Sequence, residues 1–366
     1  MQKKLSLTST LVAINTAVYV AMVLRGVSPV EPKVEQLLQW GANFGPLSLG
    51  PQPWRLLASN YLHAGILHIG LNMWCLWNLG YLAERIFDPW TYFLTYTACG
   101  LSGSIASLWW HPMVTGVGAS GAIFGLAGAL IAALYLGHLP IPKEAVRGTL
   151  KSLLTFAGYN LLFGAVGHGI DNSAHIGGIV CGLIIGALMA KHLMTEREIR
   201  NRWRGVVFVA AAAILFVMFG MVRRARAYAV PLQQGMKAIE TGKWDEAESA
   251  LEDAARKKPN DHDILFLLAT AYSQKKEYEK AEPLWQAVLR LKPNDGAAQA
   301  NLGLVQLQRQ EYEQAAATLA KAVDANPDDA DLEESLGEAY SAINQPEKAK
   351  AAFQRAVEIR KANKAK

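Results

Sequence analysis

The stretch VGASGAIFGLAGALIAALYLG, residues 117–137, indicates what kind of protein this chain forms. It holds no charged residue over a length that, as a helix, crosses the hydrocarbon core of a bilayer. Outward from it, six further apolar runs of similar length have almost no charge inside. The seven predicted spans are 7–24, 66–83, 90–110, 117–137, 149–167, 172–190 and 205–222. Seven such runs predict a polytopic membrane helix bundle rather than the buried helices of a soluble protein.

The charge balance divides the chain into two parts. Residues 1–227 carry 17 Lys and Arg against 8 Asp and Glu, whereas residues 228–366 carry 19 against 23. The basic excess of the first part lies between apolar runs, where it indicates membrane topology rather than nucleic-acid binding. All three cysteines, Cys75, Cys99 and Cys181, lie inside apolar runs, which argues against a disulfide framework or a zinc site.

Lys and Arg near the span ends predict the orientation. With the N-terminus in the cytoplasm, eleven of these residues lie inside and six outside. Seven spans then put the C-terminal part outside the cytoplasm. Arg223, Arg224 and Arg226 count against this orientation, because they follow the seventh span on its outer side.

From Tyr228 onward the apolar runs give way to a repeat of 34 residues. The prolines of KPND, KPND and NPDD keep this spacing, and so do two small positions and one aromatic position in each unit. These are Pro259, Pro293 and Pro327; Gly235, Ala269, Gly303 and Gly337; Ala247, Ala281, Ala315 and Ala349; and Trp244, Tyr278 and Tyr312, with Pro346 in the last unit. The period is typical of tetratricopeptide repeats and predicts a soluble α-solenoid of three to four units. Its concave face would bind peptides, the alternative being a spacer without a ligand.

Two of the predicted spans begin with residues that suit nucleophilic catalysis. The sequence Gly118-Ala119-Ser120-Gly121 opens the fourth span, where unpaired N–H groups at a helix N-terminus face any oxyanion formed there. His175 opens the sixth span, and imidazole near neutral pH can remove the proton that makes serine a poor nucleophile. Glycines at four-residue spacing on both spans predict close packing that brings this serine and histidine together. The plainer interpretation is that these residues only serve helix packing.

The second span supplies His68 and Asn72, which lie four residues apart and so on one helix face. Each can offer an N–H to a developing oxyanion. A metal site including His63 is the competing interpretation, but no Asp or Glu accompanies these residues and HIGLN is not a metalloprotease motif. We therefore expect neither a metal nor a cofactor.

Together these motifs closely resemble the rhomboid proteases. The resemblance covers roughly residues 1–190 and rests on Trp54-Arg55, His63-Ala64-Gly65, HIGLNM from His68, GASGAIFG from Gly118 and AHIGG from Ala174. It implies a six-helix core with a water-filled cavity open to the outer face, and the Trp-Arg pair in the long loop after the first span. It further implies Ser120 as nucleophile and His175 as general base, without an acidic third member. His68, Asn72 and the Ser120 N–H would stabilise the oxyanion, Phe124 would pack against His175, and Gly118, Gly121 and Gly178 would pack the site.

The sequence thus predicts an all-α protein in three parts: a six-helix rhomboid core (1–190), a basic linker with a seventh span (191–227), and the repeats (228–366). The predicted function is hydrolysis of transmembrane protein substrates in a bacterial inner membrane, with protein or peptide partners bound by the repeats and no nucleic acid. The alternatives are an inactive rhomboid-like protein that binds membrane clients, which should lack the serine or the histidine, and a membrane-anchored repeat scaffold, which needs fewer spans.

Overall fold

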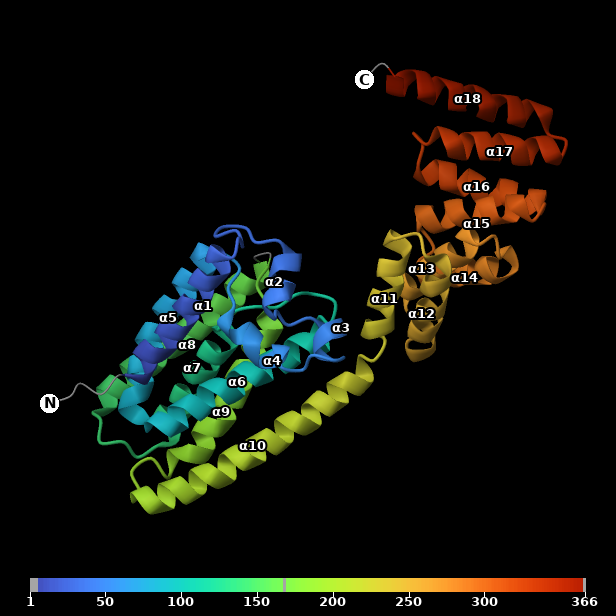
Figure 1. The fold of residues 1–366 in the computed structure, drawn as a ribbon. Coiled ribbons are helices and arrows are strands. Elements are labelled where there is room, and N and C mark those ends of the chain that lie inside the picture. The colour runs from blue at the N-terminus through green and yellow to red at the C-terminus, as the bar shows by residue number, and fades with distance from the viewer. Residues whose placement is uncertain (1–5, 167–168, 365–366) are drawn as a thin grey trace. The chain divides into compact units, whose positions relative to one another are not determined.

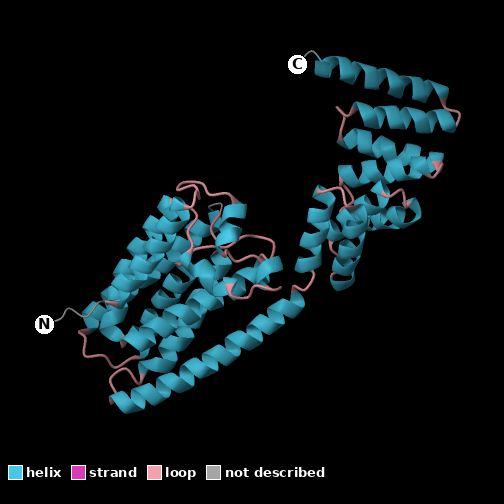
Figure 2. Cartoon of the chain, viewed as in Figure 1, coloured by secondary structure: helices cyan, strands magenta, loops and turns pink. Residues whose placement is uncertain are grey.

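The computed structural model describes residues 6–166 and 169–364. Within these residues the regular elements are helices (Figure 2), apart from one antiparallel bridge between Asn43 and Gly116. The chain divides into two compact units, Met1–Arg226 and Ala227–Lys366. The all-α fold class predicted from the sequence is confirmed.

Each predicted span coincides with a helix of the first unit (Figure 1). These are α1 (Leu7–Leu24), α5 (Ile66–Ile86), α6 (Pro89–Trp110), α7 (Ser120–Leu136), α8 (Lys143–Val166), α9 (Asn172–Ala190) and α10 (Arg197–Ala225). Among the described residues, α1, α9 and α10 are both long and apolar enough to cross a membrane, and α7 is apolar but shorter. The predicted end of the fifth span, Gly167, lies outside the described residues. Both α8 and α10 begin earlier than predicted, because their first turns are charged and the apolar run starts later.

The helix α7 lies at the centre of the first unit, and nearly all of its side chains are buried. Its backbone is in direct contact with that of α9. A Cβ atom built on Gly178 would lie 2.0 Å from the carbonyl oxygen of Gly121, and one on Gly182 would lie 1.9 Å from that of Gly125. Only glycine fits at such distances, so the predicted close packing of these two helices is confirmed.

Substitution of Gly182 by Ala should destabilise the first unit by about 1–3 kcal/mol or more, because the new methyl group meets backbone that cannot move aside. Gly158→Ala in α8 is the matched control, since a Cβ there has no atom within 4 Å. Thermal unfolding of both variants in detergent measures the difference. Equal midpoints for the two would contradict this account of the α7–α9 packing.

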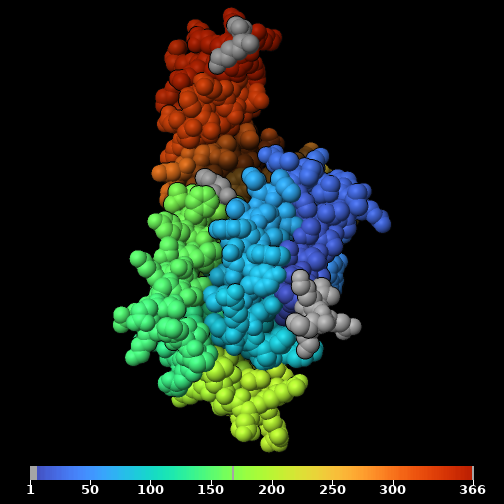
Figure 3. Space-filling model, turned by 90° about the vertical axis from the view of Figure 1, so that its left-hand side faces the viewer, coloured from blue at the N-terminus to red at the C-terminus, as the bar shows by residue number. Residues whose placement is uncertain are grey.

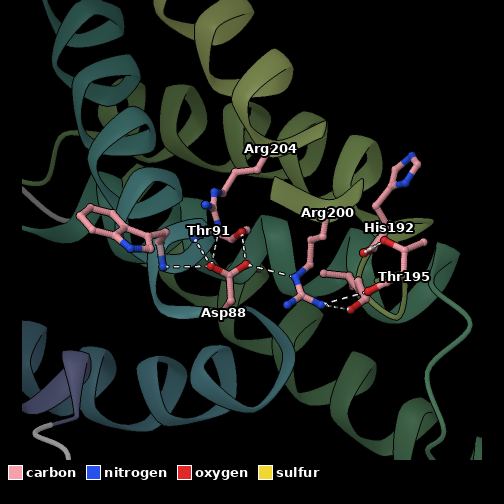
Figure 4. Close-up of polar contacts among 8 residues, drawn as sticks. Asp88, Thr91, His192, Thr195, Arg200 and Arg204 are labelled. Carbon is pink, nitrogen blue, oxygen red and sulfur yellow. Dashed lines mark hydrogen bonds and ion pairs between the residues drawn. The ribbon is translucent and has the colours of Figure 1, made fainter. Parts of the chain in front are cut away.

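The acidic side chain of Asp88 joins the start of α6 to α10 (Figure 4). It caps α6 by accepting hydrogen bonds from the backbone N–H groups of Trp90 and Thr91, at 3.1 and 3.2 Å. Arg204 Nη1 donates to it at 2.7 Å, and Arg200 Nε lies 3.7 Å away. Burial acts to raise the pKa of Asp88, but the Thr91 hydrogen bonds, the charge of Arg204 and the Trp90 hydrogen bond together outweigh burial and lower it. The ionised carboxylate therefore fastens α10 to α6.

The loop between α1 and α5 is itself structured. It contains α2 (Val34–Trp40), α3 (Gly45–Ser48), α4 (Arg55–Ala58) and the short 3-10 helix η1 (Ser59–Tyr61). Arg55 is buried and donates to the backbone oxygens of Leu38 at 2.7 Å and Ala42 at 3.1 Å, which lie at the end of α2. Its guanidinium also lies 5.0 Å from the centre of the Trp54 ring. The Trp-Arg pair thus lies in the predicted loop and ties together its first and second halves.

Over its described residues, 227–364, the second unit contains four helix pairs. Their helices are α11 (Ala229–Glu240), α12 (Trp244–Lys257), α13 (His262–Gln274), α14 (Tyr278–Leu291), α15 (Gly296–Gln308), α16 (Tyr312–Ala325), α17 (Ala330–Ala342) and α18 (Pro346–Lys364). The second helix of each pair begins at the recurring aromatic or proline position. Small residues in the first helix make room for large side chains of the second: a Cβ on Gly235 would lie 2.5 Å from Leu251, and one on Gly337 would lie 2.7 Å from Phe353. The predicted repeats are confirmed and extend to a fourth unit.

Candidate active site

Three helix N-termini of the first unit bring the predicted site residues to one cavity. Ser120 is the first residue of α7, His175 the fourth of α9 and His68 the third of α5. The cavity has a volume of about 450 Å³. Its walls include Ser120, His175, His68, Asn72, Phe124, Gly118 and Gly121. Gly178 lies one turn after His175 and packs on the backbone of Gly121. Helix N-termini carry a partial positive charge, so this cavity favours a developing anion.

The turn before Ser120 needs glycine for two reasons. Gly118 has φ +124°, which side-chain-bearing residues rarely adopt. A Cβ there would also lie 2.7 Å from His68 Nε2. The Gly118 N–H donates to the Ser59 carbonyl at 2.9 Å, and Gly116 forms the bridge to Asn43. The structured loop after α1 therefore fixes the backbone that presents the serine.

The ring of His175 is held by stacking rather than by a carboxylate. It lies parallel to the Phe124 ring, at 4.1 Å between centroids and 7° between planes. His175 Nδ1 is buried and has no hydrogen-bond partner among the described residues. The nearby carboxylate of Asp171 instead caps α9, accepting from Ser173 Oγ and the Ala174 N–H. Within the described residues, no carboxylate hydrogen-bonds to the His175 ring.

The tautomer of His68 follows from its neighbours. Its Nδ1 accepts a hydrogen bond from the Ala64 N–H at 3.3 Å, so in the neutral ring the proton must be on Nε2. Nε2 is the atom that lies against Gly118, two residues before Ser120. His68 thus presents an N–H donor to the part of the cavity where an oxyanion would form.

Asn72 lies one turn further along α5 and is buried. Its Nδ2 donates to the His68 carbonyl at 2.9 Å. An amide nitrogen carries two hydrogens, so the second remains for a group in the cavity. His68 and Asn72 are therefore both able to donate from the same helix face, as their spacing predicted.

Sequence reasoning missed the polar wall behind the serine. Asn43 Nδ2 donates to the Ser104 carbonyl at 3.0 Å, while Ser104 Oγ and Asn60 Nδ2 both donate to the Leu56 carbonyl, at 2.9 and 2.7 Å. These side chains line the cavity and come from the loop and from α6. No local motif marks them, because Ser104 is 61 residues from Asn43 and 48 residues from Leu56 in the sequence.

The structure records no hydrogen bond between Ser120 and His175, although both line the cavity. Such bonds between catalytic groups are often long in unliganded sites and shorten when substrate binds. The rings of His63 and His68 lie 5.2 Å apart. Across the part of the chain that is described, three or more His, Cys, Asp or Glu side chains nowhere gather in a metal-binding arrangement.

Both units are similar to known proteins. Residues 50–192 match the rhomboid domain family, and residues 238–304 and 300–364 match two tetratricopeptide repeat families. Over 246 residues the chain is 33% identical to rhomboid protease GluP of Bacillus subtilis (strain 168), a match that covers 67% of this chain and 47% of that protein. It is 27% identical over 237 residues to rhomboid protease AarA of Providencia stuartii, covering 59% of this chain and 82% of that protein. The chain thus spans about half the length of the Bacillus relative.

Among solved structures, a MamA chain from Desulfovibrio magneticus RS-1, beginning at its residue 41, is 31% identical. The match covers 37% of this chain and 75% of that chain, with a TM-score of 0.35.

Proposed function

The chain belongs to the rhomboid family and carries C-terminal tetratricopeptide repeats, and from this premise we propose that it is an intramembrane serine endopeptidase that cuts transmembrane proteins. The observation that carries the proposal is the single cavity lined by a serine, a histidine stacked on Phe124, and two neighbouring side-chain N–H donors. We assign the chemistry to residues 1–190, the linker and seventh span to 191–227, and recruitment to 228–366.

The proposed reaction uses Ser120 and His175 as a dyad. Ser120 Oγ attacks the carbonyl carbon of the scissile peptide bond while His175 accepts the hydroxyl proton. The tetrahedral oxyanion accepts hydrogen bonds from His68 Nε2, Asn72 Nδ2 and the Ser120 N–H. When the C–N bond breaks, His175 returns the proton to the leaving amine. Water then attacks the acyl-serine and gives a proton to His175; the bond between the acyl carbon and Ser120 Oγ breaks, His175 returns the proton to Oγ, and the acid product leaves.

Water must reach this acyl-serine inside a membrane protein. The buried side chains of Asn43, Asn60 and Ser104 line the cavity and suit that need, because polar groups in an apolar surrounding retain water. They give the cavity a hydrophilic back wall.

A membrane-embedded substrate would reach the cavity from the side of α5 and α8. Leu71 and Cys75 of α5 and Phe156 and Asn160 of α8 contribute to the cavity walls. Figure 3 shows α8 (green) and α5 (light blue) on one face of the first unit. Large apolar side chains on the outside of α8 are exposed, which suits contact with lipid; they are Leu154, Tyr159, Leu162, Phe163 and Val166.

The test of this proposal is cleavage by the purified full chain in lipid vesicles. A transmembrane test substrate should be cut, and mass spectrometry of the two products should locate the bond within or at the edge of its membrane segment. A protein that only binds membrane clients would leave the substrate intact.

For the orientation, we propose a cytoplasmic N-terminus, an extracytoplasmic repeat domain and a bacterial inner membrane. The relative direction of two helices supports this orientation. Helices α6 and α10 are parallel, since Asp88 at the start of α6 pairs with Arg204 in the first half of α10, and Trp109 at the end of α6 accepts from Arg226 at the end of α10. Such a parallel orientation is required if the third and the seventh span both cross the membrane from inside to outside.

Alkaline phosphatase fused after Lys366 should be active, because this enzyme works only outside the cytoplasm. If the phosphatase fusion is inactive and a fluorescent protein fused at the same position glows in the cytoplasm, the proposed topology is wrong.

We propose that the repeats recruit particular substrates or partners. Deleting residues 228–366 should raise the apparent KM for natural substrates and leave turnover of a short test substrate little changed, because tethering raises local concentration without adding a catalytic contact. The deletion variant must first be shown to insert and accumulate normally. Unchanged cleavage of natural substrates would leave the repeats only a spacer role.

A further inference from the structure

The helix α6 contacts the second half of α10 and also both helices that carry the candidate dyad, whereas the first half of α10 contacts the end of α9 directly through Trp203, which donates to the Leu188 carbonyl at 2.7 Å. On one side, Ser102 Oγ donates to the Gly177 carbonyl at 2.9 Å, two residues after His175. Gly103 is packed on the same turn, because a Cβ there would lie 2.8 Å from the Ala174 carbonyl oxygen. Together with α7, α6 therefore holds the turn of α9 that carries His175.

On its other side, α6 packs against the last turns of α10. The loop between α1 and α5 shares this cluster: its buried residues are Ile105 and Leu108 of α6, Val222 of α10, and Leu49 and Leu56 of the loop, with Leu101, Leu215 and Phe219 packed against them. Leu56 contributes both to this cluster and to the wall of the cavity. Its side chain packs in this cluster, and its carbonyl accepts from Ser104 and Asn60 in the wall of the cavity.

Arg226 closes this contact at the end of α10. Its Nε donates to the Trp109 carbonyl at 2.8 Å, and Nη2 donates to the same oxygen. Its guanidinium also lies 5.0 Å from the centre of the Trp109 ring. The Trp109 carbonyl is one of the last carbonyls of α6, and such groups have no hydrogen-bond partner inside their own helix. The C-terminal end of a helix also carries a partial negative charge, which favours a cation there.

We propose that Arg226 is a positioning residue for the peptidase. It fastens the outer end of α10 to the end of α6, and α6 in turn holds the α9 turn that carries His175. The inference rests on the proposed function, because it concerns the geometry of the same dyad. Arg226 touches neither the cavity nor the serine, so it acts only through α6.

The test uses the full chain, a short test substrate that does not need the repeats, and Arg224→Ala as the matched control. Arg224 is exposed at the same helix end. Arg226→Ala should lower kcat about tenfold with KM unchanged, because a small misplacement of a catalytic group is costly in rate. Arg226→Lys should recover part of the rate, because its ammonium group keeps the charge and can donate to the Trp109 carbonyl from one nitrogen instead of two. The rate of fluorophosphonate labelling of Ser120, per folded molecule, should fall with kcat.

Two results would overturn the inference. One is equal kcat for Arg226→Ala and Arg224→Ala; the other is a loss explained fully by less folded protein, with an unchanged labelling rate per folded molecule. If Arg226→Ala does not accumulate, Arg226→Gln, which keeps one amide donor without the charge, provides the same comparison. If the Arg226 prediction fails while Ser120→Ala is inactive, the proposed peptidase function still holds. An active Ser120→Ala would refute the function itself.

Discussion

Ser120→Ala and His175→Ala should each lower kcat/KM for a transmembrane test substrate by at least about 10⁴-fold, because either change removes the covalent pathway. Neither substitution should prevent folding. Ser120 is only partly buried at the first position of α7, and His175 Nδ1 makes no hydrogen bond that would be lost. Product formation is measured at equal amounts of folded, inserted protein.

The controls for these variants are Ser152→Ala and His138→Ala, two exposed positions of the same unit. Both should keep full activity. Near-normal cleavage by Ser120→Ala or His175→Ala would mean that another group carries the reaction, and the dyad assignment would be wrong.

Asn72→Ala should lower kcat by about 10²–10³-fold with a much smaller effect on KM, since loss of one oxyanion donor is felt mainly in the transition state. Asn78→Ala is the matched control on the same helix. Its Nδ2 makes the same type of bond, to the Trp74 carbonyl at 2.8 Å, but its side chain is exposed and lies outside the cavity. Because His68 offers a second donor, His68→Ala should show the same pattern, and the double variant should fall further.

A raised KM with unchanged kcat in Asn72→Ala would contradict this role. It would mean that Asn72 shapes the cavity for substrate and does not contact the developing oxyanion.

Those parts of the fold that depend on local pattern were predictable from the sequence. Apolar run length predicted where the seven long helices of the first unit lie, though not the short helices α2 to α4, and the 34-residue period predicted the helix pairs of the second unit. The glycine spacing on two spans predicted the contact of α7 with α9. Each of these signals repeats within a short stretch of chain, so one sequence is enough to detect it.

The parts that depend on distant pairs could not be predicted in the same way. The hydrogen bond from Asn43 to Ser104 joins residues 61 positions apart, and that from Arg226 to Trp109 joins residues 117 apart. In the sequence Arg226 is one more basic residue after a span, and it even counted against the predicted topology. The structure gives Arg226 a structural role that the sequence does not show: it donates to a carbonyl at the end of α6 that has no partner inside the helix.

The tautomer of His68 is a second case. Spacing put His68 and Asn72 on one helix face, but only the Ala64 N–H at His68 Nδ1 determines which ring nitrogen carries the proton. A donor at Nε2 is what the oxyanion role requires. The sequence identifies His68 as a candidate, and only the structure shows which of its ring nitrogens carries the proton.

The central claim, that Ser120 is a nucleophile activated by His175, is tested most directly by covalent labelling. The full chain in membranes is treated with a fluorophosphonate, and the modified residue is identified by mass spectrometry. We expect a single modified serine, Ser120, with labelling abolished in Ser120→Ala and strongly slowed in His175→Ala. An unlabelled wild-type protein, or labelling of Ser120 at an unchanged rate without His175, would contradict it.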